Sequence, residues 1–135
     1  MKLALSTIIS AIILFILSFL FYWIIFSYGF MHSYLAIIRP PTDPKMWANV
    51  AGFIIQGFLL SLIYQFYYKG ESPFKEGLIY GLLTALLISL PYLFFMWANF
   101  RIRYRGVIAE SLGYGFRILI AGIVIGLIYG KKQRT

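Results

Sequence analysis

The sequence predicts an all-α integral membrane protein, a single bundle of four transmembrane helices over residues 1–135. Three observations predict this fold class. The chain is 61% hydrophobic and only 12% charged, whereas a soluble domain carries about 25% charged residues. Its apolar residues gather in four runs, each long enough for the roughly 20 residues that a spanning helix needs. These runs lack the alternation of a membrane β-barrel strand, and backbone that faces lipid must otherwise be helical.

The four expected helices follow from these runs and from the breaks between them. They cover about residues 3–28, 47–67, 77–100 and 107–129. The first run has no charge and exceeds the roughly 7–15 apolar residues of a signal peptide, so we expect it to be retained as a helix. Prolines within 40–44 break the chain after it, because proline lacks an N–H and fixes φ. Residues 69–73 are expected to form the next turn, and the basic stretch 101–105 connects the last two helices.

Aromatic residues gather at the expected helix ends. Tyr22 closes the first helix, while Trp47 opens the second helix and Tyr64, Tyr67 and Tyr68 close it. Such clusters are typical of interfacial belts, in which the rings lie at the level of the lipid headgroups. We therefore expect these rings to anchor the helices rather than to stack on a ligand.

The formal net charge is +8, and the basic residues stand mostly at the ends of the apolar runs. This placement predicts contact with anionic lipid headgroups as the partner and no nucleic-acid binding. With both termini in the cytoplasm, six Lys or Arg residues lie on the cytoplasmic side and five on the other. The positive-inside rule favours this orientation. The near balance also permits insertion in both orientations, as an antiparallel dimer would require.

The residues that catalysis and metal binding need are scarce. The chain has no cysteine, one histidine (His32) and four acidic residues, so we expect no disulfide, metal or cofactor. It also has no nucleophile–base pair at a recognisable spacing, so we expect no enzyme. One alternative is a shallow site on one membrane side, where His32, Asp43, Asn49, Asn99 and Glu110 fall together with the arginines of 101–105.

Two ladders of small residues predict how two of the helices pack. The small residues recur every fourth position, as Gly77, Gly81, Ala85 and Ser89 in the third helix and as Gly122, Gly126 and Gly130 in the fourth. Such residues share one helix face and let two backbones approach closely in lipid. We expect the third and fourth helices to pack through these ladders; the alternative is that one ladder forms an oligomer interface. Pro91 is expected to kink the third helix.

A possible internal repeat bears on the arrangement of the helices. Residues 57–64 and 122–129 share the pattern Gly-x-x-x-small-Leu-Ile-Tyr. A duplication would give two tandem helical hairpins of the same orientation, as in transporters built from parallel repeats.

Arg117 stands near the middle of the fourth apolar run, where a fixed charge is costly and rarely lacks a partner or a purpose. Glu110 lies seven residues earlier on the same helix face, opposite the glycine ladder. In the second helix, Asn49 and Gln56 are also seven residues apart on one face, and Gln56 reaches a similar depth. These four residues form a candidate intramembrane polar network in which Gln56 accepts a hydrogen bond from Arg117. The network either holds the second and fourth helices in register or contacts a ligand; Arg117 could also stretch towards the headgroups.

Three segments carry a resemblance to a known class of proteins. Residues 21–26, 76–81 and 121–130 resemble those of small four-helix bacterial membrane proteins of unknown function. The resemblance implies the four-helix fold and the inner membrane of a bacterium, and no activity.

Two functional hypotheses remain. The first is a structural or accessory subunit that packs in a membrane complex. The second is a small oligomeric transporter or channel with a polar path near Arg117 and Gln56. A homo-oligomer or a hetero-oligomer is expected in either case.

Overall fold

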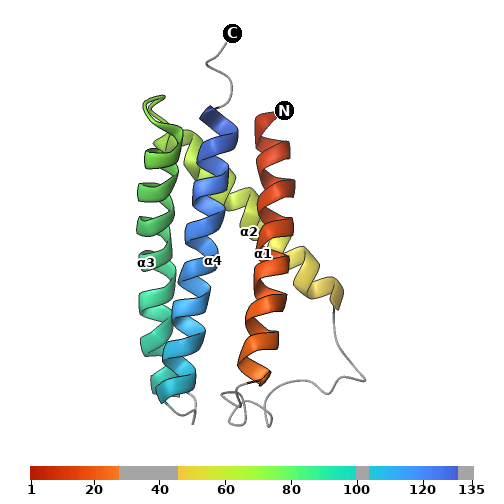
Figure 1. Cartoon of the computed structure of the whole chain (residues 1–135), viewed down its shortest axis with the longest axis vertical. Helices are drawn as coiled ribbons and strands as arrows, with labels where there is room; N and C mark the ends of the chain where they lie inside the picture. The colour runs from red at the N-terminus through yellow and green to blue at the C-terminus, as the bar shows by residue number, and fades with distance from the viewer. Residues whose placement is uncertain (28–45, 100–103, 131–135) are drawn as a thin grey trace.

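The computed structural model describes residues 1–27, 46–99 and 104–130. In these ranges the chain forms four helices: α1 (Lys2–Ser27), α2 (Met46–Tyr67), α3 (Pro73–Asn99) and α4 (Tyr104–Gly130). Each is long and apolar enough to cross a membrane. The start of α1 and the end of α4 lie at the same end of the bundle (Figure 1). The all-α, four-span fold predicted from the sequence is confirmed.

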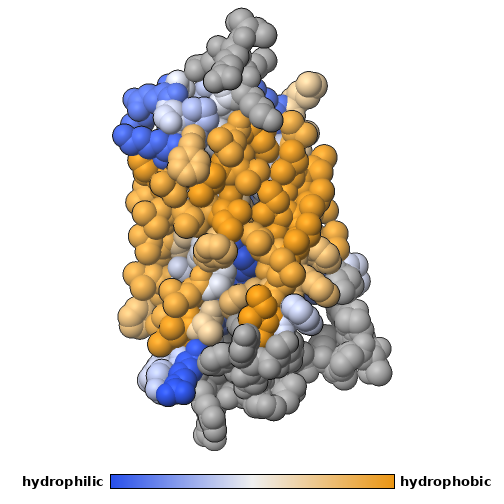
Figure 2. Space-filling model, in the orientation of Figure 1, coloured by the Kyte–Doolittle hydropathy of each residue, from blue (hydrophilic) through white to orange (hydrophobic). Residues whose placement is uncertain are grey.

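The surface of the bundle fits a lipid environment. Figure 2 shows a hydrophobic band around the middle of the visible face, with hydrophilic residues gathered towards both ends. Large apolar side chains are exposed on the spanning helices, such as Phe19, which is 66% exposed, and Phe94 and Phe116. A soluble monomer rarely exposes such a continuous apolar surface. The protein is therefore an integral membrane protein with four spans.

Helices α3 and α4 form a tight antiparallel hairpin through the predicted ladders. A Cβ atom added to Gly81 would lie 2.7 Å from the carbonyl oxygen of Leu119, and one added to Gly126 would lie 2.6 Å from the Cα of Gly77. Only glycine fits at such distances. Gly122 packs on Gly81 between these two contacts, and the residues that extend the contact towards the two ends of the hairpin are Gly130, Ala85, Ser89 and Gly115. The two ladders thus pack on each other within the chain, which leaves neither free as an oligomer interface.

Helices α3 and α4 begin earlier than the sequence predicts. Helix α3 starts at Pro73 rather than Gly77, and α4 starts at Tyr104 rather than Val107. Pro73 occupies the first helical position, where a missing N–H costs nothing, and the carbonyl of Ser72 accepts the N–H of Glu76 at 2.9 Å. The expected turn at residues 69–73 is therefore shorter. Helix α3 continues through Pro91 to Asn99.

Helices α1 and α2 form the second packed pair, again through small residues. A Cβ atom on Gly57 would lie 2.8 Å from both the hydroxyl oxygen of Ser10 and the carbonyl oxygen of Thr7. Leu14 and Leu60 fill the core of this contact. The order α1–α2 and α3–α4 agrees with two tandem helical hairpins.

The two pairs meet mainly through α1 and α4. Helix α4 lies between α3 and α1, whereas α2 runs obliquely behind them (Figure 1) and has few contacts with α4. Helices α2 and α3 meet near their connecting turn, where Tyr80 donates a hydrogen bond to the carbonyl of Leu60 at 2.6 Å. Away from this turn, α2 and α3 diverge (Figure 1).

Tyrosines close the end of the bundle near this turn. Tyr64 has no exposed surface, and its ring centroid lies 5.1 Å from that of Tyr80 and 5.2 Å from that of Tyr129. The expectation that Tyr64 belongs to an interfacial belt is wrong: it is a core residue. Its ring is enclosed by other tyrosines, and its hydroxyl donates to the buried carboxylate of Glu76 at 3.4 Å.

Candidate functional site: an intramembrane cavity with buried charges

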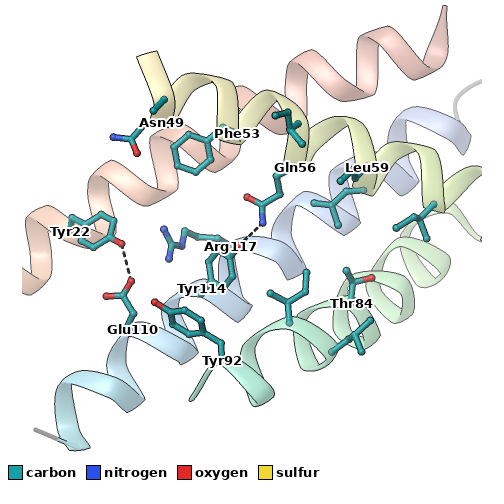
Figure 3. A pocket seen from close by; sticks show the side chains of 17 residues that line it. Tyr22, Asn49, Phe53, Gln56, Leu59, Thr84, Tyr92, Glu110, Tyr114 and Arg117 are labelled. Atoms are coloured by element: carbon teal, nitrogen blue, oxygen red, sulfur yellow. Dashed lines mark hydrogen bonds between the residues drawn. The ribbon is translucent and has the colours of Figure 1, made fainter. Parts of the chain in front are cut away.

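A cavity of about 770 Å³ lies where α2 diverges from α3 and α4. All four helices line it (Figure 3). Its walls are mostly apolar, with Leu59 and Ile63 on α2 opposite Leu87 and Ile88 on α3. All four helices contribute polar groups: Tyr22 of α1, Asn49 and Gln56 of α2, Thr84 and Tyr92 of α3, and Glu110, Tyr114 and Arg117 of α4. A volume of this size matches the roughly 300–1,000 Å³ of small-molecule sites.

Arg117 is buried at the edge of this cavity and is 5% exposed. Its Nε donates to the carbonyl of Gly113 at 3.1 Å, and its Nη1 donates to the hydroxyl of Ser18 at 2.6 Å. The guanidinium carbon lies 5.0 Å from the ring centroid of Phe21 and 5.1 Å from that of Tyr114. Cation–π contacts of this kind stabilise a desolvated cation by about 2 kcal/mol. The charge is thus held mostly by α1 and by its own helix.

The side chain that accepts a hydrogen bond from Arg117 is Ser18, and not Gln56 as expected from the sequence. Gln56 does not accept from the guanidinium; its Nε2 donates to the Tyr114 hydroxyl at 3.0 Å, and the ring of Tyr114 lies against Arg117. Ser18 takes the expected role because α1, and not α2, packs beside α4 at this depth. Gln56 and Arg117 therefore share a cavity and connect only through Tyr114.

Glu110 is the second buried charge, and it is 6% exposed. Its Oε1 accepts a hydrogen bond from the Tyr22 hydroxyl at 2.8 Å, whereas its Oε2 is buried without a partner. Tyr22 also lies 5.8 Å from the Arg117 guanidinium. No ion pair joins Glu110 to Arg117 in the described part of the chain; Tyr22 instead contacts both, through its hydroxyl with Glu110 and through its ring with Arg117.

Asn49 lines the same cavity from the first turns of α2 (Figure 3). All four residues of the predicted polar network thus border one cavity. Gln56 and Glu110 each bond to a tyrosine whose ring lies against Arg117, and not to Arg117 itself. The alternative shallow site cannot be traced: His32, Asp43, Arg101 and Arg103 lie outside the described residues.

Sequence reasoning missed Ser18, Tyr22 and Tyr114 as parts of this site. Tyr114 stands four residues after Glu110 and three before Arg117, a spacing that places all three on one helix face. This signal was present in the sequence. Ser18 and Tyr22 lie on another helix, and their role depends on the packing of α1 against α4.

Comparisons with known proteins do not assign this chain to a family. No family model matches the chain, and no curated protein and no solved structure matches it. The four-span architecture that the resemblance implied is present, but no family follows from these comparisons.

Proposed function

We propose that the chain is a small membrane transporter or channel whose intramembrane cavity binds a polar ligand beside Arg117 and Gln56. The observation that carries this proposal is the burial of Arg117 at the edge of a cavity of about 770 Å³. Its two hydrogen bonds leave N–H donors of the guanidinium without an acceptor among the described residues. A charge in the membrane interior is costly, and its presence is by default the basis for a functional-site hypothesis.

A purely structural role explains these contacts less well. A network that only held two helices in register would be expected to satisfy its charges within the protein, because an unpaired buried group is costly. Here the Glu110 carboxylate keeps a free oxygen, and the two opposite charges are not paired with each other. Buried groups of this kind that border a cavity are typical of a ligand site.

Replacing Arg117 with glutamine tests the proposal. The wild-type chain, gently solubilised and measured by native mass spectrometry, is expected to be a homo-oligomer that retains a small bound molecule. Arg117→Gln is expected to fold and to lose that molecule, because glutamine offers fewer donors and no charge. Arg105→Gln is the matched control, since Arg105 is exposed on the same helix.

Other outcomes would contradict the proposal. Loss of folded Arg117→Gln protein, with no bound molecule in the wild type, would indicate a structural arginine. A stable hetero-complex would favour the accessory subunit instead. The few contacts of α2 with α4 support that second candidate, because they leave the side of α2 that faces away from α1 available to a partner helix.

We further propose the inner membrane of a bacterium, with both termini in the cytoplasm and anionic lipids around the basic ends. The chain has no cysteine, so single cysteines introduced before Lys2 and after Thr135 report on each end separately. Both are expected to react with a membrane-impermeant thiol reagent only after the membrane is opened. Labelling of both ends in half of the molecules while the membrane is still intact would instead indicate insertion in two orientations.

A further inference from the structure

The cavity holds one positive and one negative side chain at different depths. Glu110 and Arg117 are seven residues apart on α4, which is roughly 10 Å along the helix axis. Both border the cavity, both are at least nine-tenths buried, and no ion pair joins them. The two formal charges cancel, so the site as a whole is neutral but strongly polar along one direction.

Each charge keeps unused hydrogen-bonding capacity. The guanidinium has donors without an acceptor among the described residues. The carboxylate uses Oε1 for Tyr22, and its Oε2 is enclosed by neighbours without a partner. Glu110 itself borders the cavity, and the last torsion of a glutamate side chain is soft, which allows the carboxylate to reorient towards a ligand.

A ligand that carries only a negative charge or only a positive charge would fit this site poorly. An anion at Arg117 would leave Glu110 uncompensated and would bring a net negative charge into a medium of low dielectric constant. A cation at Glu110 would leave Arg117 uncompensated and would bring a net positive charge into the same medium. A ligand with both charges compensates both side chains at once.

The remaining walls determine the rest of the ligand. Leu59 and Ile63 on α2 and Leu87 and Ile88 on α3 give the part of the cavity between these two helices apolar walls. An apolar chain on the ligand would be buried there, which is favourable in proportion to the area removed from water.

We propose, on the basis of the ligand-binding role proposed above, that the cavity binds an amphipathic zwitterion. Its acidic group pairs with Arg117, its ammonium group pairs with Glu110, and its apolar part lies between α2 and α3 (Figure 3). Two sources carry this chemistry: the headgroup of a zwitterionic phospholipid and a free apolar amino acid.

The test uses the full chain in detergent and three probes. Dihexanoyl phosphatidylethanolamine represents the lipid headgroup, L-leucine represents the free zwitterion, and dihexanoyl phosphatidylglycerol is the anionic lipid with the same chains. Isothermal titration calorimetry gives each dissociation constant. Wild-type protein is expected to bind one of the two zwitterions at least tenfold more tightly than phosphatidylglycerol.

Variants assign the two charges. Glu110→Gln and Arg117→Gln are each expected to weaken binding of the preferred zwitterion at least tenfold. Glu71→Gln and Arg105→Gln, which make the same changes at exposed positions, are expected to leave it unchanged. Tighter binding of leucine would identify a free amino acid as the source, and tighter binding of phosphatidylethanolamine would identify a lipid; both support the proposal.

Two results would overturn the zwitterion proposal. The first leaves the proposed ligand-binding function in place, and the second rejects that function as well. If wild-type protein binds phosphatidylglycerol as tightly as both zwitterions, the ligand is a simple anion and the cavity keeps its proposed function. If no probe binds and the protein retains no molecule in native mass spectrometry, both the zwitterion and the ligand-binding role fail. The comparison of the three probes on wild-type protein tests the zwitterion proposal even if a variant does not fold.

Discussion

Replacing Gly81 with leucine is expected to lower the free energy of unfolding by about 3 kcal/mol or more, the upper end of the cost of overpacking. A Cβ atom at this position would lie 2.7 Å from the Leu119 carbonyl oxygen and 3.2 Å from the Leu119 Cα. Both are backbone atoms, so no side chain can turn aside. The helices must separate, and the close packing that holds α3 to α4 is lost. Thermal unfolding in detergent, followed by circular dichroism, measures the effect.

Gly52→Leu is the matched control for this experiment. A Cβ atom on Gly52 would have no other atom within 4 Å, because this residue faces the cavity from α2. Leucine also has the higher helix propensity, by a little under about 1 kcal/mol. We therefore expect Gly52→Leu to unfold at the wild-type temperature or above it. Equal stability of Gly81→Leu and the wild type would show that the glycine contact does not hold the hairpin.

Replacing Glu76 with alanine is expected to lower the free energy of unfolding by about 2–4 kcal/mol, given about 1–3 kcal/mol for each buried group left unpaired. Glu76 is 5% exposed, and its carboxylate accepts three hydrogen bonds. Oε1 accepts the backbone N–H of Glu71 at 2.7 Å. Oε2 accepts the N–H of Lys69 at 3.2 Å and the Tyr64 hydroxyl at 3.4 Å. The carboxylate thus fastens the turn between α2 and α3.

Chemical denaturation of Glu76→Ala and Glu71→Ala side by side would test this role. Both variants remove one acidic side chain from the same turn, but Glu71 is exposed. We expect Glu71→Ala to stay within about 0.5 kcal/mol of the wild type, as surface substitutions usually do. Similar losses in the two variants would show that net charge matters and that the three hydrogen bonds do not.

The four spans and the α3–α4 packing could be predicted from the sequence because each depends on local pattern. The bilayer sets the length of an apolar run, and the small residues recur at the helical spacing. The predicted start of α3 lies too far along the chain because the stretch ending at Pro73 was interpreted as a turn. Proline also suits a first helical position. Gly115 extends the contact outside the regular spacing, so the ladder pattern did not include it.

The candidate site could be predicted only in part. Helix periodicity places Glu110 and Arg117 on one face of α4, and both border the cavity. Periodicity within one helix does not say which helix lies opposite, so Gln56 was taken as the acceptor where Ser18 of α1 is found. Glu76 has no distinguishing spacing; its burial depends on how the α2–α3 turn closes over it. The cavity itself follows from the oblique course of α2, which depends on packing across the whole bundle.

The unequal packing of the helices also bears on how this chain can diverge over evolutionary time. Most substitutions on the facing surfaces of α3 and α4 meet backbone and should be removed by selection. Substitutions on the cavity side of α2 meet open space at Gly52 and few contacts with α4 elsewhere. We therefore expect descendants of one ancestor to keep the α3–α4 hairpin almost unchanged while the cavity side of α2 diverges, so that a lineage can alter what it recognises without losing the ability to fold.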